Sequence, residues 1–174
     1  MTKDKEITKT NAARLLDSVG IAYELIPYSY SEDDLSAQSV AAELGEDIDM
    51  VFKTLVLRGD KSGLFVCVIP GDFEVDLKTA ARLSGNKSCE MVHVKELLSL
   101  TGYIRGGCSP IGMKKQYPTF VHESALLYDY IYISAGESIV IWHMLDCYGI
   151  YVKERLCFLY CNEPVKHVLS PLEV

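Results

Sequence analysis

The run from Gly102 to Lys115, Gly-Tyr-Ile-Arg-Gly-Gly-Cys-Ser-Pro-Ile-Gly-Met-Lys-Lys, has the composition of a ligand-binding loop. Its glycines permit positive φ and let a ligand come close to backbone N–H groups. Successive N–H groups in such turns form a concavity that binds anions or an oxyanion. The run therefore indicates the wall of a binding site. A glycine-rich turn between two elements is the alternative.

Lys53 is the clearest single candidate for a functional residue, because it interrupts the apolar strand pattern Val51-Phe52-Lys53-Thr54-Leu55-Val56-Leu57. Strand interiors seldom hold an unpaired lysine, so its ammonium could point into a cleft and bind an anionic or carbonyl oxygen. A lysine that faces water on an edge strand, or that blocks aggregation there, is the alternative. In a regular strand Thr54 points to the opposite face.

Ser134 and Cys108 carry the other groups with possible chemistry. Ser134 ends an apolar strand before Ala135-Gly136, where a hydroxyl can bind a ligand or cap the turn. Nothing near Cys108 in sequence would lower its thiol pKa, which favours a packing role over a nucleophile. The four histidines have no acidic or cysteine neighbour at catalytic spacing, and the Gly-x-Ser-x-Gly, phosphate-loop and dinucleotide motifs are missing.

Length and composition predict one globular domain over residues 1–174, with 49% hydrophobic residues and a sizeable core. No apolar run reaches the roughly 18 residues of a membrane span, and the polar start lacks a signal-peptide core, so we expect a cytoplasmic protein. The six cysteines then read as free thiols. Cys157, Cys161 and His167 are too weak a set to predict zinc, so we expect no metal and no cofactor.

The net charge of −7 argues against indiscriminate polyanion binding. Lysines and arginine nevertheless cluster at Lys78, Arg82 and Lys87, and again at Lys114 and Lys115. If the two clusters meet in the fold, a nucleic-acid backbone could dock there. Each side chain taken alone is more typical of a solvated surface.

Capping residues and hydrophobic periodicity predict the elements that position these groups. Helices are expected over 8–18 (capped by Thr8 or Thr10), 36–44, 76–83 and 93–100, and a loop over 28–34. Strands are expected over 21–26, 51–57, 64–69, 119–121 and 130–133, with 59–63 as a hairpin turn and 139–142 as a closing strand. The order lacks regular βαβ spacing, which predicts an α+β fold: a compact mixed sheet or partial barrel flanked by helices.

Three motifs together resemble the YbaK/EbsC family, the Cys-tRNA(Pro) deacylase group of the prolyl-tRNA synthetase editing-domain superfamily. They are Phe52-Lys53-Thr54-Leu55, the run entered by Thr101-Gly102-Tyr103 and continuing through Gly112, and Ser134-Ala135-Gly136. Their order and spacing match over about residues 10–136. The resemblance implies a single editing domain and the family's mixed barrel-like fold.

The resemblance also implies a trans-editing aminoacyl-tRNA deacylase. Such an enzyme hydrolyses mischarged Cys-tRNA(Pro), because a synthetase pocket cannot strongly reject a near-isostere of proline. The expected partners are that tRNA and prolyl-tRNA synthetase. The family is thought to lack a protein nucleophile, and the substrate thiol is proposed to attack its own carbonyl, which is a lyase-like cyclisation. The enzyme then supplies positioning and oxyanion stabilisation.

Residue by residue, the resemblance assigns catalytic roles to Lys53, Gly106 and Ser134. Lys53 would hold the phosphate or ester end, Gly106 would face the reacting carbonyl, and Ser134 would line the pocket. The implied substrate-binding residues are Tyr28, Thr54, Gly107, Ser109 and Pro110.

The sequence departs from the family pattern over 137–174, where the usual basic residue and glycine after Gly136 are replaced by Glu137-Ser138. An altered reading frame is one hypothesis for this segment. The departure keeps a second function open, a non-catalytic module of the same fold that binds tRNA or a synthetase. A small-molecule or nucleotide-binding regulator is a third.

Overall fold

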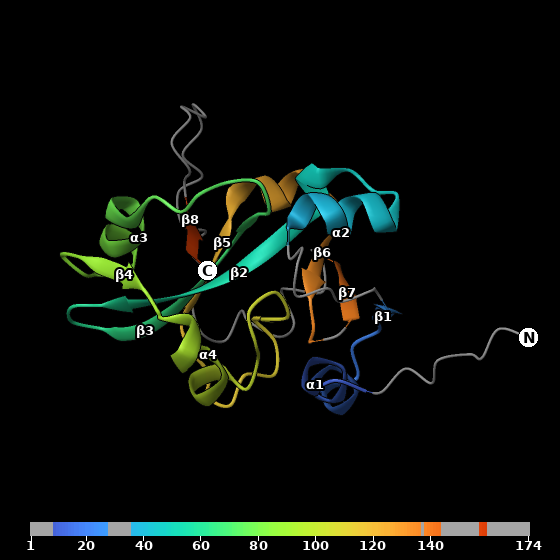
Figure 1. Cartoon of the computed structure of the whole chain (residues 1–174), viewed down its shortest axis with the longest axis horizontal. Coiled ribbons are helices and arrows are strands. Elements are labelled where there is room, and N and C mark those ends of the chain that lie inside the picture. Colours follow the sequence, from blue (N-terminus) through green and yellow to red (C-terminus); the bar gives the residue numbers. More distant parts are fainter. Residues whose placement is uncertain (1–8, 28–35, 137, 144–156, 160–174) are drawn as a thin grey trace, which may run out of the picture.

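The computed structural model describes residues 9–27, 36–136, 138–143 and 157–159, and Figure 1 shows their arrangement. Its α-helices are α1 (Asn11–Val19), α2 (Ala37–Leu44), α3 (Leu77–Leu83) and α4 (Val94–Thr101). Two short 3₁₀ helices span Ile48–Met50 and Glu123–Leu127. The strands are β1 (Glu24–Pro27), β2 (Val51–Gly59), β3 (Gly63–Pro70), β4 (Cys89–Met91), β5 (Thr119–His122), β6 (Tyr130–Ser134), β7 (Ser138–His143) and β8 (Cys157–Leu159).

Side-chain caps start three of the helices at the predicted residues. The Thr10 and Ser36 hydroxyls accept the N–H groups of Ala13 and Ser39, and the Asp76 carboxylate accepts those of Lys78 and Thr79. These bonds satisfy N–H groups that lack a partner within the helix. Left-handed glycines end α1, α2 and α4, which explains why the sequence marked these helices well.

The strands form one mixed sheet in the order β1-β7-β6-β2-β3-β5-β8, with β4 pairing β2 as a branch. The β6–β2, β3–β5 and β5–β8 pairs are parallel, and the others are antiparallel. The described strands do not close into a barrel, so the α+β prediction is confirmed in its open, mixed-sheet form. The predicted closing strand at 139–142 is confirmed as part of β7.

The structure differs from the prediction most clearly at β1 and β4. The first strand begins at Glu24 instead of residue 21 and includes Pro27, which an edge strand tolerates because it needs no donor on its outer side. The sequence also did not predict β4. Its three residues are half-buried or exposed, so they carry too little apolar alternation to be recognised. The predicted loop at 28–34 lies outside the described residues.

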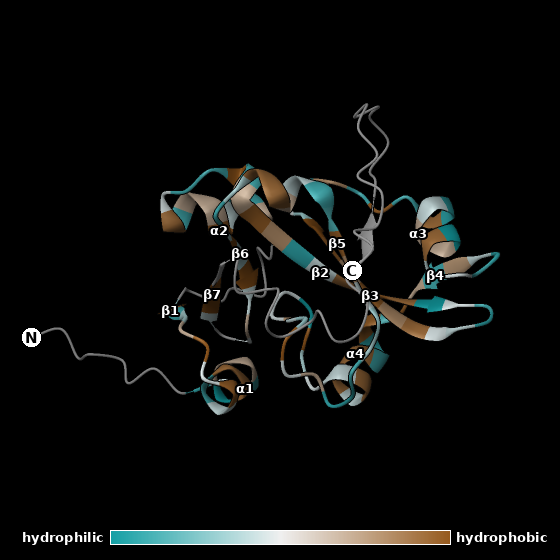
Figure 2. Cartoon of the chain, turned by 180° about the vertical axis from the view of Figure 1, so that it is seen from behind, coloured by the Kyte–Doolittle hydropathy of each residue, from teal (hydrophilic) through white to brown (hydrophobic). Residues whose placement is uncertain are grey.

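Side-chain alternation along β2 divides the core into two layers. Phe52 and Val56 face the largest cluster, which α1 and α4 cover, whereas Leu57 faces a cluster under α3. Val51 lies on the same face as Leu57 and packs in a third cluster beneath α2. Figure 1 shows α2 and α3 on one side of the sheet and α1 and α4 on the other, and Figure 2 shows the apolar strands between them.

Leu57→Ala should destabilise the fold by about 2–5 kcal/mol, because the side chain is fully buried and its loss leaves a cavity. Leu127→Ala is the matched control, because Leu127 is 79% exposed and its loss should cost less than about 0.5 kcal/mol. Urea unfolding of both variants measures the difference. Equal unfolding midpoints would contradict the proposed core.

Candidate functional site

One edge of β2 is shared by two strands that do not meet. At its start, Val51 and Phe52 pair with Tyr132 and Ile133 of β6. At its far end, residues 57–59 pair with β4, and the Val92 N–H donates to the Val56 carbonyl at 3.0 Å. No described strand pairs with this edge at residues 53–55. We call this stretch the open edge of β2.

A cleft of about 820 Å³ lies at the open edge. The first residues of α2, the β4–α4 segment, the glycine-rich run and the β6–β7 pair surround it. Its lining residues are Ser36, Ala37, Gln38, Val40, residues 51–56, Gly71, Met91, Val92, Val94, Leu97, Arg105, Gly106, Cys108, Tyr132, Ser134 and Ile139.

Lys53, Gly106 and Ser134 all line this cleft, although they are far apart in sequence. The parallel register of β2 and β6 pairs Phe52 with Ile133, so Lys53 and Ser134 follow at the point where these strands part. The Ser134 hydroxyl donates to the Gly106 carbonyl at 3.0 Å. Ser134 thus fixes the orientation of the Gly106 peptide in the cleft wall.

Backbone contacts hold the glycine-rich run against this edge. The Gly136 N–H donates to the Gly107 carbonyl at 2.9 Å, and a Cβ on Gly107 would lie 2.6 Å from the Gly136 carbonyl oxygen. Gly106 adopts a φ of 83°, which favours glycine. The buried Tyr103 hydroxyl donates to the Ile111 carbonyl at 2.7 Å and closes the run on itself.

The predicted binding residues divide into two groups in the structure. Thr54 lines the cleft, whereas Gly107, Ser109 and Pro110 are buried and are not among the lining residues. Gly107 packs against Gly136, and the Ser109 hydroxyl accepts a hydrogen bond from the Ile111 N–H at 3.2 Å. These contacts stabilise the conformation of the glycine-rich run and do not face the cleft. Tyr28 lies outside the described residues.

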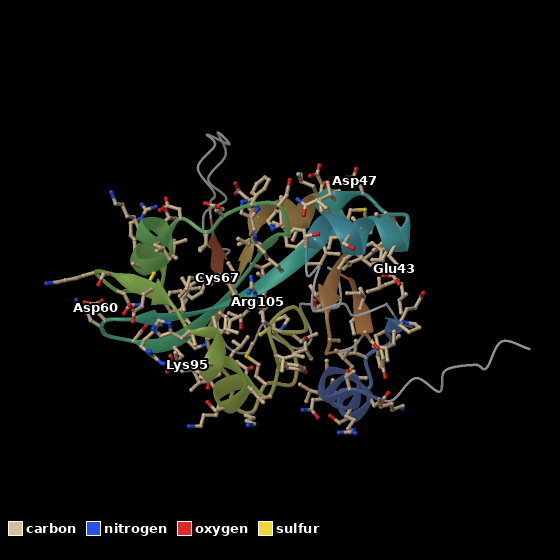
Figure 3. The ribbon with its side chains drawn as sticks, viewed as in Figure 1. Glu43, Asp47, Asp60, Cys67, Lys95 and Arg105 are labelled. Atoms are coloured by element: carbon tan, nitrogen blue, oxygen red, sulfur yellow. The ribbon has the colours of Figure 1, made fainter. Side chains whose placement is uncertain are left out.

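Arg105 lines the cleft beside Gly106, and sequence reasoning did not single it out. Its position directly before the first glycine of the Gly-Gly pair was the available signal. Figure 3 labels Arg105 close to the middle of β2. The predicted basic clusters do not meet: Lys78 and Arg82 lie on α3, whereas Lys114 donates to the Leu98 carbonyl of α4 across the sheet.

Among the described residues that line the cleft, the titratable groups are Lys53, Arg105, Cys108 and Tyr132, which include two cationic side chains and no carboxylate or imidazole. Burial raises the pKa of the Cys108 thiol to about 12. At neutral pH this thiol is therefore protonated and is a poor nucleophile. The lining residues that the structure describes thus offer positive charge and backbone groups without a nucleophile–base pair.

The described residues hold no cluster of three or more metal-ligating side chains, and Cys157, Cys161 and His167 lie beyond the described side chains. Cys67, Cys89 and Cys108 are not joined in disulfides. Among the described helices, none combines the length and apolar character that crossing a bilayer requires.

Comparison with known sequences gives a consistent result. The family model for the aminoacyl-tRNA editing domain matches residues 32–141. The chain is 53% identical over 137 residues to an Enterococcus faecalis protein named "Putative Cys-tRNA(Pro)/Cys-tRNA(Cys) deacylase EbsC", covering 79% of this chain and 84% of that protein. It is 28% identical over 86 residues to a proline–tRNA ligase of Thermosipho africanus, covering 49% of this chain and 15% of the ligase.

Solved structures share the fold. A crystal structure described as "a putative trans-editing enzyme for prolyl tRNA synthetase" superposes with a TM-score of 0.73 at 20% identity, covering 86% of this chain and 94% of the other. A hypothetical protein of known structure gives a TM-score of 0.76 at 19% identity, covering 86% and 98%. At these identities the likeness establishes the fold alone.

Cys108 should resist iodoacetamide in the native protein at pH 7.5 and should react readily in urea, because its thiolate is scarce in the fold. Its native modification rate should keep rising with pH towards about 12, whereas an exposed thiol levels off above its ordinary pKa. The raised folded-state pKa means that its contribution to stability is complete below the unfolded pKa and declines as pH rises towards 12.

Mass spectrometry of peptides that contain Cys108 measures both rates. Rapid modification of the native protein at pH 7.5 would contradict the buried, protonated thiol and would reopen Cys108 as a nucleophile.

Proposed function

The chain belongs to the aminoacyl-tRNA editing-domain family, and we propose that it is a trans-editing deacylase that hydrolyses mischarged Cys-tRNA(Pro). Family membership and the 53% identity to EbsC support this substrate class. The observation that carries the proposal is the cleft itself. It combines two cations and a fixed glycine wall, and its described lining residues contain no nucleophile–base pair.

Trans-editing is needed because a synthetase discriminates poorly between amino acids of similar size. A synthetase pocket that accepts proline cannot exclude the similarly sized cysteine by more than a modest factor, so a second hydrolytic site must remove the error. An editing domain with a cleft of this kind suits the task. The cleft has to bind the aminoacyl ester at the end of the tRNA, and the proposed selectivity resides in the chemistry of the amino acid.

The cleft residues would position the ester and stabilise its developing charge. Lys53 and Arg105 would attract the phosphate at the tRNA end and the ester oxygen, since both cations line the same cavity. Gly106 would face the reacting carbonyl, held by the hydrogen bond from Ser134. Fixed groups of this kind lower a barrier by orientation and by electrostatic preorganisation.

The substrate would supply the nucleophile. In this step the cysteine sulfur attacks the ester carbonyl, the bond from the carbonyl carbon to the ribose oxygen breaks, and the thiol proton ends on the released ribose hydroxyl. The product would be a four-membered cyclic thioester that water then opens to cysteine. The protonated state of Cys108 supports this proposal, because the cleft's own thiol is poorly suited to attack.

The proposed activity also implies which partners the protein has and in which compartment it acts. Mischarged tRNA is the substrate, and prolyl-tRNA synthetase is the proposed partner that supplies it, in the cytoplasm where tRNA is charged. The net charge of −7 makes a partner useful, because a free acidic protein attracts a polyanion weakly.

Purified protein should hydrolyse Cys-tRNA(Pro) well above the spontaneous rate and leave Pro-tRNA(Pro) and Ala-tRNA(Pro) intact, because only cysteine carries the thiol. Loss of the labelled aminoacyl group over time measures the three rates. 2-Aminobutyryl-tRNA(Pro) is the matched control, since its ethyl side chain keeps the size of the cysteine side chain and lacks the thiol nucleophile. Intact esters in every case, from folded protein, would favour the non-catalytic binding module.

Lys53→Ala should lower the deacylation rate at least about a hundredfold, since it removes a cation at the ester. Lys61→Ala is the control, because Lys61 lies exposed in the β2–β3 turn and should leave the rate unchanged. Single-turnover assays and thermal unfolding of both variants separate activity from folding. A fully active Lys53→Ala variant would contradict the assigned role.

A further inference from the structure

The hydrogen-bonding direction of every β2 residue follows from three bonds. The Gly71 N–H donates to the Val51 carbonyl at 2.8 Å, and β2 and β3 are antiparallel in a continuous register. Odd-numbered β2 residues therefore direct their N–H and C=O groups to β3, and even-numbered residues direct theirs to the other edge. The Val92 to Val56 bond, on that other edge, and the Val66 to Pro118 bond, on the far side of β3, agree with this assignment.

Thr54 is thus the one residue whose backbone groups point into the open edge. Phe52 on one side of it pairs with β6, and Val56 on the other accepts from Val92. Thr54 itself pairs only with Val68, at a position of the antiparallel ladder where the two residues exchange no hydrogen bonds. Its N–H and C=O therefore face the cleft from the middle of a nine-residue central strand.

The Thr54 side chain shows the same lack of a protein partner. Its hydroxyl oxygen is buried, and it is the only buried side-chain nitrogen or oxygen without a hydrogen bond among the described residues. Buried polar groups in native proteins are nearly always paired, because an unpaired one loses its hydrogen bonds to water without replacing them. The N–H, C=O and hydroxyl groups of Thr54 are thus available to hydrogen-bond a ligand that enters the cleft.

The open edge has room for a single residue. Only one even-numbered position separates the position that pairs with β6 from the position that bonds to the β4 side. In an extended residue, the N–H and C=O groups point to the same side and can complete a ladder pair with such a position. An aminoacyl group has this arrangement, with an ammonium beside a carbonyl oxygen.

We propose that the aminoacyl group of the substrate binds as a one-residue strand at the open edge of β2, an inference that rests on the proposed deacylase function. The Thr54 carbonyl accepts a hydrogen bond from the α-ammonium group, and the Thr54 N–H donates to the ester carbonyl oxygen. Strand addition at an exposed sheet edge gives binding through the main chain and leaves side-chain selection to the neighbouring pocket.

This arrangement gives Thr54 two tasks. The pairing with the α-ammonium group orients the ester, so the substrate's own side chain is held next to its carbonyl. The N–H bond to the carbonyl oxygen strengthens as negative charge grows there, which makes the Thr54 N–H a donor to the oxyanion. A backbone donor cannot be identified from residue types, because every residue except proline carries one.

Amide hydrogen exchange followed by NMR tests the inference. In the free protein, the Thr54 amide should exchange at least tenfold faster than those of Lys53 and Leu55, although all three lie in the same central strand. The probe is 3′-cysteinylamino-3′-deoxyadenosine, a stable amide analogue of the tRNA end. At saturation it should slow Thr54 exchange at least tenfold and leave its two neighbours unchanged. 3′-Amino-3′-deoxyadenosine, which lacks the aminoacyl group, is the control and should give no protection.

The outcomes separate this inference from the proposed function, which the Cys-tRNA(Pro) assay tests. Hydrolysis without Thr54 protection overturns the strand-addition site and leaves the deacylase. Protection without hydrolysis supports the site and overturns the deacylase. Failure of the analogue to bind at millimolar concentration, or slow exchange of Thr54 already in the free protein, overturns the inference outright.

Discussion

The structure depends on one constraint: the central strand β2 pairs with two different strands along a single edge. β6 pairs with its first residues in parallel, and β4 pairs with its last residues in antiparallel orientation. Neither strand pairs with residues 53–55, so the edge remains open between them. An open edge in the centre of a sheet leaves main-chain groups exposed where a core would otherwise close.

The remaining elements turn this opening into a cleft. The glycine-rich run lies beside it because the Gly107–Gly136 pair allows a backbone approach that side chains would prevent. Ser134, at the end of β6, fixes the Gly106 peptide at the position where β6 leaves β2. The α2 start and the β4–α4 segment complete the walls. Strands β2 and β6 therefore hold Lys53, Thr54 and Ser134, and the hydrogen bond from Ser134 ties the Gly106 peptide of the glycine-rich run to them.

Local signals in the sequence were enough for most of the fold. Thr10, Ser36 and Asp76 cap helices through bonds to their own next residues, and glycines end three helices through positive φ, so neither depends on distant contacts. The short strand β4 escaped prediction because its place is fixed by pairing with β2, which no local pattern encodes.

The candidate site was predicted in part. Lys53 stood out as a lysine within an apolar strand and Ser134 as a hydroxyl at a strand end, and the family resemblance assigned roles to both and to Gly106; all three line the cleft. Gly107 and Ser109 belong to the same motif, yet their contacts lie behind the wall. The open edge at Thr54 could not be read from residue types, because it results from the register of three strands.

A crystal structure with the cysteinylamino analogue bound would test the central claim, that the open edge of β2 receives the substrate, most directly. The account predicts the aminoacyl group between β6 and β4, with its nitrogen within hydrogen-bonding distance of the Thr54 carbonyl and its carbonyl oxygen facing the Thr54 N–H. An aminoacyl group bound elsewhere, with the Thr54 edge left open, would contradict it.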